Sequence, residues 1–236
     1  MNAFRLLGFA SLLFLSPAFS APATVAPAVG SGAASPKADP FAKWEKEIAA
    51  FEASDRKSPP PKNPILFVGS STFRKWSTLS EDFSGLPVLN RGFGGSNFPD
   101  LNHFFDRLVL PYAPKTVVVY EGDNDIAQGH PPAQVLADWQ IFADKVRSSI
   151  PEARVIFISI KPSLKRESLL PVQNQANAAI RADIGTRENM VFLDIVPAML
   201  DPSGRPEENL LSSDKLHMSP AGYALWREKL GPLLRK

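Results

Sequence analysis

The chain of 236 residues contains no cysteine and only three histidines. The absence of cysteine excludes disulfides, thiolate metal sites, iron–sulfur clusters, cysteine nucleophiles and lipids attached to cysteine. A three-histidine zinc site would have to use His103, His130 and His217 together. Excess charge is also lacking, because 26 basic side chains are balanced by 24 acidic ones. Nucleic acid is therefore not expected as the main partner, since binding along a phosphate backbone needs clustered basic charge.

The N-terminal apolar run is too short to span a bilayer. This run, Leu6–Leu15, is well below the roughly 20 residues that a spanning helix needs. It follows Arg5 and precedes Pro17 and an Ala-Phe-Ser sequence that ends at Ser20, an order typical of a secretory signal peptide. The alternative is an uncleaved anchor helix. We expect cleavage after Ser20, export to the periplasm or out of the cell, and no membrane span in the mature protein.

The rest of the chain predicts one α/β domain preceded by a linker. Residues 21–40 are mostly Ala, Pro, Ser and Gly, and such a segment cannot bury apolar surface. Apolar residues make up 44% of the whole chain, which is enough for a sizeable core. We therefore expect residues 1–20 to be a signal peptide, 21–40 a flexible linker and 41–236 the functional domain.

Short apolar runs alternate with segments of helical periodicity. The predicted strands are Ile65–Val68, Val88–Asn90, Lys115–Tyr120, Arg154–Ile160 and Val191–Leu193. The predicted helices are Phe41–Arg56, Asn97–Leu110, Pro132–Ser149, Val172–Arg187 and Ser219–Leu234. This alternation indicates a five-stranded, mainly parallel sheet with helices on both faces, a three-layer α/β/α sandwich. Ligands of such sheets bind at the carboxyl ends of the strands.

The loops expected at that edge carry a distinctive set of chemical groups. They are Gly69–Thr72 after the first strand, Asn90–Asn97 around the second, Glu121–Asp125 after the third and Ser213–Ser219 before the last helix. Together they supply hydroxyls, a glycine-rich backbone, a side-chain amide and an Asp–His pair. These groups are the ones required for hydrolysis through an acyl-serine intermediate.

Each group has a specific role in such a reaction. His217 can take the proton of a serine, and Asp214, three residues earlier, can hold the other imidazole nitrogen. A tetrahedral intermediate also needs hydrogen-bond donors for its negatively charged oxygen. The backbone amides of Ser71 and Gly95 and the side-chain amide of Asn124 can provide them.

These blocks resemble the SGNH hydrolase superfamily, also called GDSL-type esterases and lipases. The first family block, usually Gly-Asp-Ser, is matched by Gly69-Ser70-Ser71, so the resemblance places the nucleophile at Ser71. It places the oxyanion-hole glycine at Gly95. Ser70 stands where the family has aspartate, which leaves Ser70 as the competing nucleophile.

The remaining blocks match in the same order along the chain. Gly122–Asp125 matches Gly-x-Asn-Asp and places the oxyanion-hole amide at Asn124. Asp214 and His217 match Asp-x-x-His and complete the triad. Asp194, after the fifth predicted strand, is the competing triad acid.

Two phrases, Ile65–Ser71 and Ser159–Ser163, are similar to the branch of platelet-activating factor acetylhydrolase catalytic subunits. The resemblance implies a flavodoxin-like fold and hydrolysis of carboxylic esters, without a metal or an organic cofactor. The substrate would be a small-molecule, glycan or lipid ester, and the lack of an extended apolar lid favours short acyl groups. A non-catalytic module that binds cell-envelope glycan is the alternative function.

Several residues have less specific interpretations. Ser71 is also suited to cap a helix, and Gly92–Gly95 lacks the spacing of a phosphate-binding loop. We expect His130 to be a solvated loop residue. For Arg91 and Arg166, surface ion pairing is favoured over substrate binding.

Overall fold

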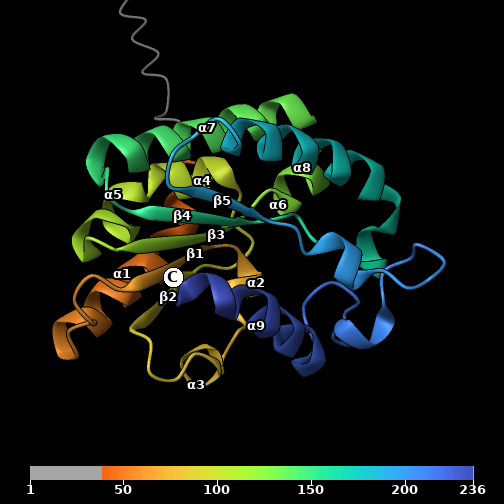
Figure 1. Ribbon diagram of the computed structural model, residues 1–236. Coiled ribbons are helices and arrows are strands. Elements are labelled where there is room, and N and C mark those ends of the chain that lie inside the picture. The colour runs from red at the N-terminus through yellow and green to blue at the C-terminus, as the bar shows by residue number, and fades with distance from the viewer. Residues whose placement is uncertain (1–38, 236) are drawn as a thin grey trace, which may run out of the picture. The chain divides into compact units, whose positions relative to one another are not determined.

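The computed structural model describes residues 39–235, so the expected signal peptide and most of the expected linker lie outside the described residues. Five strands form one parallel sheet in the order β2-β1-β3-β4-β5 (Figure 1). They are β1 Ile65–Gly69, β2 Val88–Gly92, β3 Thr116–Tyr120, β4 Arg154–Ile158 and β5 Met190–Leu193. The predicted parallel α/β architecture is therefore confirmed.

The helices lie on both faces of this sheet. The longer ones are α1 Ala42–Lys57, α7 Pro132–Ser149, α8 Leu170–Ile184 and α9 Pro220–Leu234, and the shorter ones are α2 Ser71–Arg74, α3 Leu79–Asp82, α4 Phe98–His103, α5 Phe105–Leu108 and α6 Asp123–Ala127. Short 3-10 turns complete the connections at Leu110–Tyr112, Leu164–Leu169, Val196–Met199 and Glu208–Leu210. Among residues 39–235, no helix combines the length and apolarity needed to cross a bilayer.

Alternate residues of each strand pack into two separate cores. In β1, Leu66 and Val68 pack with α7 and α8, whereas Ile65 and Phe67 pack with Trp226 of α9. Figure 1 shows the same division, with α7 and α8 over one face of the sheet and α9 over the other. The buried strands are apolar on both sides because both faces are covered.

The predicted helix Asn97–Leu110 is wrong as a single element. The structure has α4 and α5 instead, separated at Phe104, whose backbone angles (φ −89°, ψ 9°) are not helical. Phe104 and Phe105 are both buried, although successive residues of a helix point about 100° apart. The break lets both rings reach the core.

Candidate active site

The loops after β1, β2 and β3 meet at one edge of the sheet. Gly69, the last residue of β1, lies between Gly92 of β2 and Tyr120 of β3. The amide of Ser70 donates to the carbonyl of Tyr120 (3.1 Å), and the amide of Phe93 donates to that of Gly69 (2.9 Å). The chain segments that carry Ser71, Gly95 and Asn124 therefore start from neighbouring points, as the sequence predicts.

A sharp turn at Gly69 positions Ser71. Gly69 has φ +133°, and a Cβ placed on it would lie 2.1 Å from the carbonyl oxygen of Tyr120, so only glycine fits there. Ser70 is buried, whereas Ser71 begins α2. The hydroxyl Oγ of Ser71 lies 2.9 Å from Nε2 of His217. The structure thus brings Ser71 to the imidazole.

His217 and Asp214 form a pair within one tight loop. Nδ1 of His217 lies 2.6 Å from Oδ2 of Asp214. The other oxygen, Oδ1, accepts hydrogen bonds from the amides of His217 (2.8 Å) and Leu216 (2.9 Å) and from the hydroxyl of Ser212 (2.8 Å). Lys215 adopts φ +59°, which allows the loop to close around the carboxylate. Asp214 therefore fixes both the loop and the ring.

This environment changes the pKa values of both groups. Burial alone would raise the pKa of Asp214, but the hydrogen bonds from His217, Leu216 and Ser212 outweigh it and lower that pKa. Burial lowers the pKa of His217, and this effect, together with the nearby cations Lys75 and Lys161, outweighs the opposing influence of Asp214. The imidazole is therefore neutral, and able to accept a proton, at neutral pH.

Asp194, the competing acid, is engaged elsewhere. It forms an ion pair with Arg181 and accepts hydrogen bonds from the amide of Val196 (3.1 Å) and the hydroxyl of Ser159 (3.5 Å). Among the described residues, the acid that contacts the ring of His217 is Asp214.

Asn124 lies in the first turn of α6, in a segment that the sequence pattern had indicated as a loop. Gly122 starts this helix with φ +102°, and a Cβ there would lie 2.6 Å from Ile160. Nδ2 of Asn124 donates to the carbonyl of Ser96 (2.8 Å), and its Oδ1 accepts from Arg166 (3.0 Å). An amide group has two N–H donors, so one remains available while the other is bound to Ser96.

The two expected backbone donors, Ser71 and Gly95, lie at a helix start and in a turn. Ser71 is the first residue of a helix, so its amide has no partner within that helix. Gly95 adopts φ +74° in the turn beside Ser96, which glycine does without strain. A Cβ on Gly95 would reach only ordinary contact, 3.5 Å from the ring of Trp44. The positive backbone angle, and not crowding by neighbours, therefore explains why glycine occupies position 95.

Residues 64–225 match the model of the GDSL-like Lipase/Acylhydrolase family. The chain belongs to this family. It is an ester-hydrolysing enzyme, as the sequence predicts.

The similar proteins span most of this hydrolase. Over 176 residues it is 29% identical to platelet-activating factor acetylhydrolase IB subunit alpha1 of Pongo abelii, an alignment that covers 72% of this chain and 74% of the relative. A solved structure of a candidate platelet activating factor from Streptococcus pneumonia has a TM-score of 0.72 at 21% identity, covering 81% of this chain and 93% of the other. A GDSL-like lipase from Bacteroides thetaiotaomicron has a TM-score of 0.67 at 18% identity, with 83% and 97% covered. These two structures support the fold.

Two lysines of the hydrolase lie beside Asp214 and His217, and the sequence analysis does not identify them as site residues. Lys161 is fully buried, and its Nζ donates to the carbonyl of Leu216 (2.6 Å), next to His217. Nζ of Lys75 lies 3.5 Å from Oδ2 of Asp214 and 3.1 Å from Nδ1 of His217. Because Nδ1–H donates to Asp214, Lys75 is best placed to pair with the carboxylate. Lys161 directly follows the fourth predicted strand, and this position indicates that it lies at the edge of the sheet where ligands bind.

Both arginines that the sequence singled out are also placed. Arg91 is buried, and it pairs with Asp55 and donates to the hydroxyl of Tyr112 (2.7 Å). The expectation of a surface ion pair is therefore wrong for Arg91, because the pair lies beneath α1. Arg166 instead contacts Asp123 (2.8 Å) as well as Asn124, and so lies at the site.

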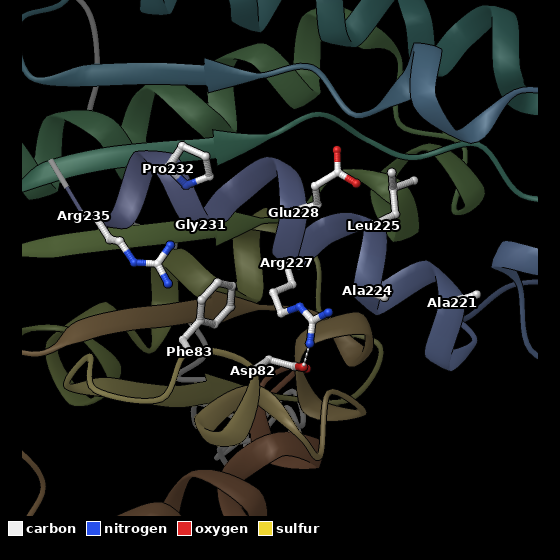
Figure 2. Close-up of a pocket in the computed structure, with 10 residues that line it drawn as sticks. All are labelled: Asp82, Phe83, Ala221, Ala224, Leu225, Arg227, Glu228, Gly231, Pro232 and Arg235. Atoms are coloured by element: carbon white, nitrogen blue, oxygen red, sulfur yellow. Dashed lines mark hydrogen bonds and ion pairs between the residues drawn. The ribbon is translucent and has the colours of Figure 1, made fainter.

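A cavity of about 780 Å³ lies away from these residues, between α3 and α9 (Figure 2). It is lined by Phe83 and by the ion pair of Asp82 with Arg227 (3.1 Å), together with residues along one side of α9. Its lining does not include Ser71, Asp214 or His217. This hollow is therefore separate from the candidate active site.

Proposed function

We propose that this hydrolase is an exported serine esterase that removes short acyl groups, chiefly acetyl, through an acyl-serine intermediate. The observation that carries the proposal is the continuous chain of contacts from Oγ of Ser71 to Nε2 of His217 (2.9 Å) and from Nδ1 to Asp214 (2.6 Å). A nucleophile, a base and an orienting acid in this order form the arrangement that activates a serine.

In the first half of the reaction, Nε2 of His217 accepts the proton of Ser71 as Oγ adds to the ester carbonyl carbon. The bond to the leaving alcohol then breaks, and the alcohol takes the proton from His217. In the second half, a water molecule gives a proton to His217 while its oxygen adds to the acyl carbon. The carboxylic acid leaves as Ser71 regains the proton.

The negative charge that develops on the carbonyl oxygen needs donors already in place. We assign this role to the amides of Ser71 and Gly95 and to the free N–H of Asn124. Arg166 holds Oδ1 of Asn124 (3.0 Å), so the amide cannot turn its oxygen toward the charge. Arg166 is thus a positioning residue for the oxyanion hole.

Two observations favour short acyl groups. The relative from Pongo abelii, 29% identical, is by name an acetylhydrolase. In addition, Ile141 is the large hydrophobic side chain that stands exposed among residues 39–235, and it lies on α7, outside the loops of the site. A lipase that binds long chains at an interface would need a larger exposed apolar surface.

Export rests on the N-terminal sequence. Residues 1–20 have the charge, apolar run and small residues of a signal peptide, and residues 21–40 have the composition of a linker. We propose that the mature enzyme acts in the periplasm or outside the cell as one domain.

The test is hydrolysis of p-nitrophenyl esters from acetyl to palmitoyl, with acetylated sugars assayed beside them. We expect the highest kcat/KM for acetyl esters and a steep fall with chain length. A maximum at long chains would contradict the substrate proposal but leave the mechanism standing.

The mechanism is tested separately by labelling with a fluorophosphonate, which reacts with an activated serine. Ser71→Ala should abolish both labelling and turnover, whereas Ser70→Ala, the matched control, should keep most of both. Folding of each variant is checked by circular dichroism. An unlabelled wild-type protein would contradict the proposed activated serine.

A further inference from the structure

A cluster of three ionisable side chains lies behind the oxyanion loop and takes no part in the proposed reaction. Asp125 belongs to the first turn of α6, His130 to the loop that follows, and Asp138 to α7. One potential ligand atom from each residue lies within 4.8 Å of the others. The side chain of Asp125 is fully buried, and Asp138 is 6% exposed. The sequence had suggested a solvated His130, but its Nδ1 is buried here.

Each of these residues has an atom without a hydrogen-bond partner among the described residues. These atoms are Oδ2 of Asp125, Oδ2 of Asp138 and Nδ1 of His130. The other carboxylate oxygens are bound, because Oδ1 of Asp125 accepts from the amide of Phe98 (3.0 Å) and Oδ1 of Asp138 accepts from Gln134 (3.0 Å). His130 does not satisfy these oxygens, because its Nδ1 has no hydrogen-bond partner either and lies 3.9 Å from Oδ1 of Asp125, the oxygen that Phe98 already binds.

Such an arrangement is costly unless something binds to it. A buried carboxylate oxygen that has lost its water and gained no donor destabilises the fold, and two of them close together add charge repulsion. In each carboxylate, Oδ1 is fixed by a hydrogen bond while Oδ2 has no partner. This pattern is the one by which outer partners orient metal ligands.

We propose that Asp125, His130 and Asp138 bind one divalent transition-metal ion, with Zn²⁺ as the best chemical match. One imidazole nitrogen and two carboxylate oxygens are a ligand set suited to zinc, whereas Ca²⁺ and Mg²⁺ prefer oxygen alone. The charge of the ion balances two carboxylates. His130 is 31% exposed at its side chain, so water can complete the tetrahedron from that side.

Binding requires only a small closing movement. Zinc bonds to oxygen and nitrogen are about 2.0–2.2 Å long, so the three ligand atoms must approach to within about 4 Å of one another. His130 lies on a loop and can supply this movement. The ion would then join α6, its following loop and α7, and it would hold the helix turn that carries Asn124. Its role is structural, because none of its ligands contacts Ser71 or His217.

The experiment uses the purified protein stripped of metal with a chelator and then titrated with Zn²⁺. Calorimetry should give one tightly bound zinc per chain near pH 7.5. Zinc at a hundredfold excess over its Kd should raise Tm by about 5 °C or more, because an ion that binds only the folded chain stabilises it. His130→Ala and Asp138→Asn should each weaken binding at least tenfold and remove most of the Tm shift.

Two histidine variants serve as controls. The ring of His103 lies outside the cluster and stacks on Phe41, with 3.8 Å between the ring centroids. The His103→Ala variant should therefore bind zinc like the wild type. His217→Ala tests whether zinc binds at the triad instead, and it should also keep the tight site. His130→Gln provides a second loop variant in case the alanine variant is unstable.

The proposal is overturned if His130→Ala binds zinc as tightly as the wild type, or if His217→Ala is the variant that loses it. A Tm that follows pH but is unchanged by zinc would also overturn it, since protons would then satisfy the cluster. Ester hydrolysis is measured alongside, so loss of this site is distinguishable from loss of the active site.

Discussion

Asn124 is held on both sides of its amide, by Ser96 and by Arg166. Such a group is already oriented when charge develops on the substrate, so it acts on the transition state more than on the bound ester. We predict that Asn124→Ala lowers kcat by about a hundredfold or more, as loss of one preorganised donor does. KM should change much less. Steady-state kinetics with p-nitrophenyl acetate provides the check, and a large rise in KM at constant kcat would show ground-state binding instead.

Lys75 acts on the imidazole through charge. A cation beside His217 disfavours the protonated ring, and the pKa of His217 lies below its ordinary value of 6.5 through burial first and then through Lys75 and Lys161. The proposed mechanism requires the neutral ring, so kcat/KM should fall only below the usual histidine range as pH decreases. Lys75→Met should raise the pKa of His217 and move this fall to higher pH.

The measurement is kcat/KM for p-nitrophenyl acetate between pH 4 and pH 9, which reports the free enzyme. Lys75→Arg keeps the positive charge and is the matched control, with a profile close to that of the wild type. A shift of the Lys75→Met profile to lower pH would contradict the assigned interaction.

Substitution of the two candidate acids, Asp214 and Asp194, should have different effects on activity. In the proposed mechanism Asp214, which contacts His217, stabilises the imidazolium that forms during reaction, whereas Asp194 pairs with Arg181. Asp214→Asn should therefore reduce kcat by roughly three to four orders of magnitude. Asp194→Asn removes a similar charge elsewhere and should retain most activity. Both variants are assayed after their folds are verified by circular dichroism, and the reverse order of activities would move the triad acid to the end of β5.

At the scale of the elements, an ion pair between Asp55 and the buried Arg91 connects α1 to the sheet. Asp55 of α1 pairs with Arg91 of β2, and its Oδ2 accepts from the hydroxyl of Tyr112 (2.6 Å). Burial raises the pKa of Tyr112 to about 12, even though Arg91 acts in the opposite direction. Removing one member of such a pair leaves a buried charge without compensation.

We predict that Asp55→Ala lowers the free energy of unfolding by about 3 kcal/mol, mainly through the unpaired Arg91. The double variant Asp55→Ala, Arg91→Met should recover part of this loss because no charge then remains buried. Urea unfolding of both proteins measures the difference. Equal stability of the single and double variants would rule out the unpaired charge as the cause.

The elements that the sequence predicts well are those with a distinct apolar pattern, which is a continuous run for a buried strand and a 3.6-residue period for a long helix. The run Val117–Val119 identifies β3 because buried parallel strands are continuously apolar, and α7 shows full helical periodicity. Helices of four or five residues, such as α2 and α6, are too short to show a helical period. Their presence depends on tertiary contacts, such as that of Gly122 with Ile160.

The same distinction applies to the site. The residues in contiguous blocks, such as Asp214 and His217, are recognisable because their spacing is local. Lys75 and Lys161 reach the loop of Asp214 and His217 from different segments, and their contacts with Asp214 and Leu216 follow only from the folded chain. The cluster of Asp125, His130 and Asp138 depends in the same way on how α6 packs against α7.

At the scale of the whole molecule, the proposed signal peptide leads to a prediction about the mature chain. Export with cleavage after Ser20 leaves Ala21 as the first residue. Intact mass and N-terminal sequencing of protein recovered from the periplasm or the medium measure this directly. A chain that retains Met1 in the membrane fraction would show an uncleaved anchor instead.

The acid and the base of the proposed triad lie three residues apart in one loop, and the carboxylate of Asp214 is bound by the amides of that same loop. The pair could therefore be transferred between proteins as one continuous segment. A scaffold that already presents the serine and oxyanion loops would gain both partners through exchange of a single segment, without matching changes on another strand. Loss of the same segment would remove both at once, so one recombination event is enough to convert an esterase of this kind into a protein that only binds.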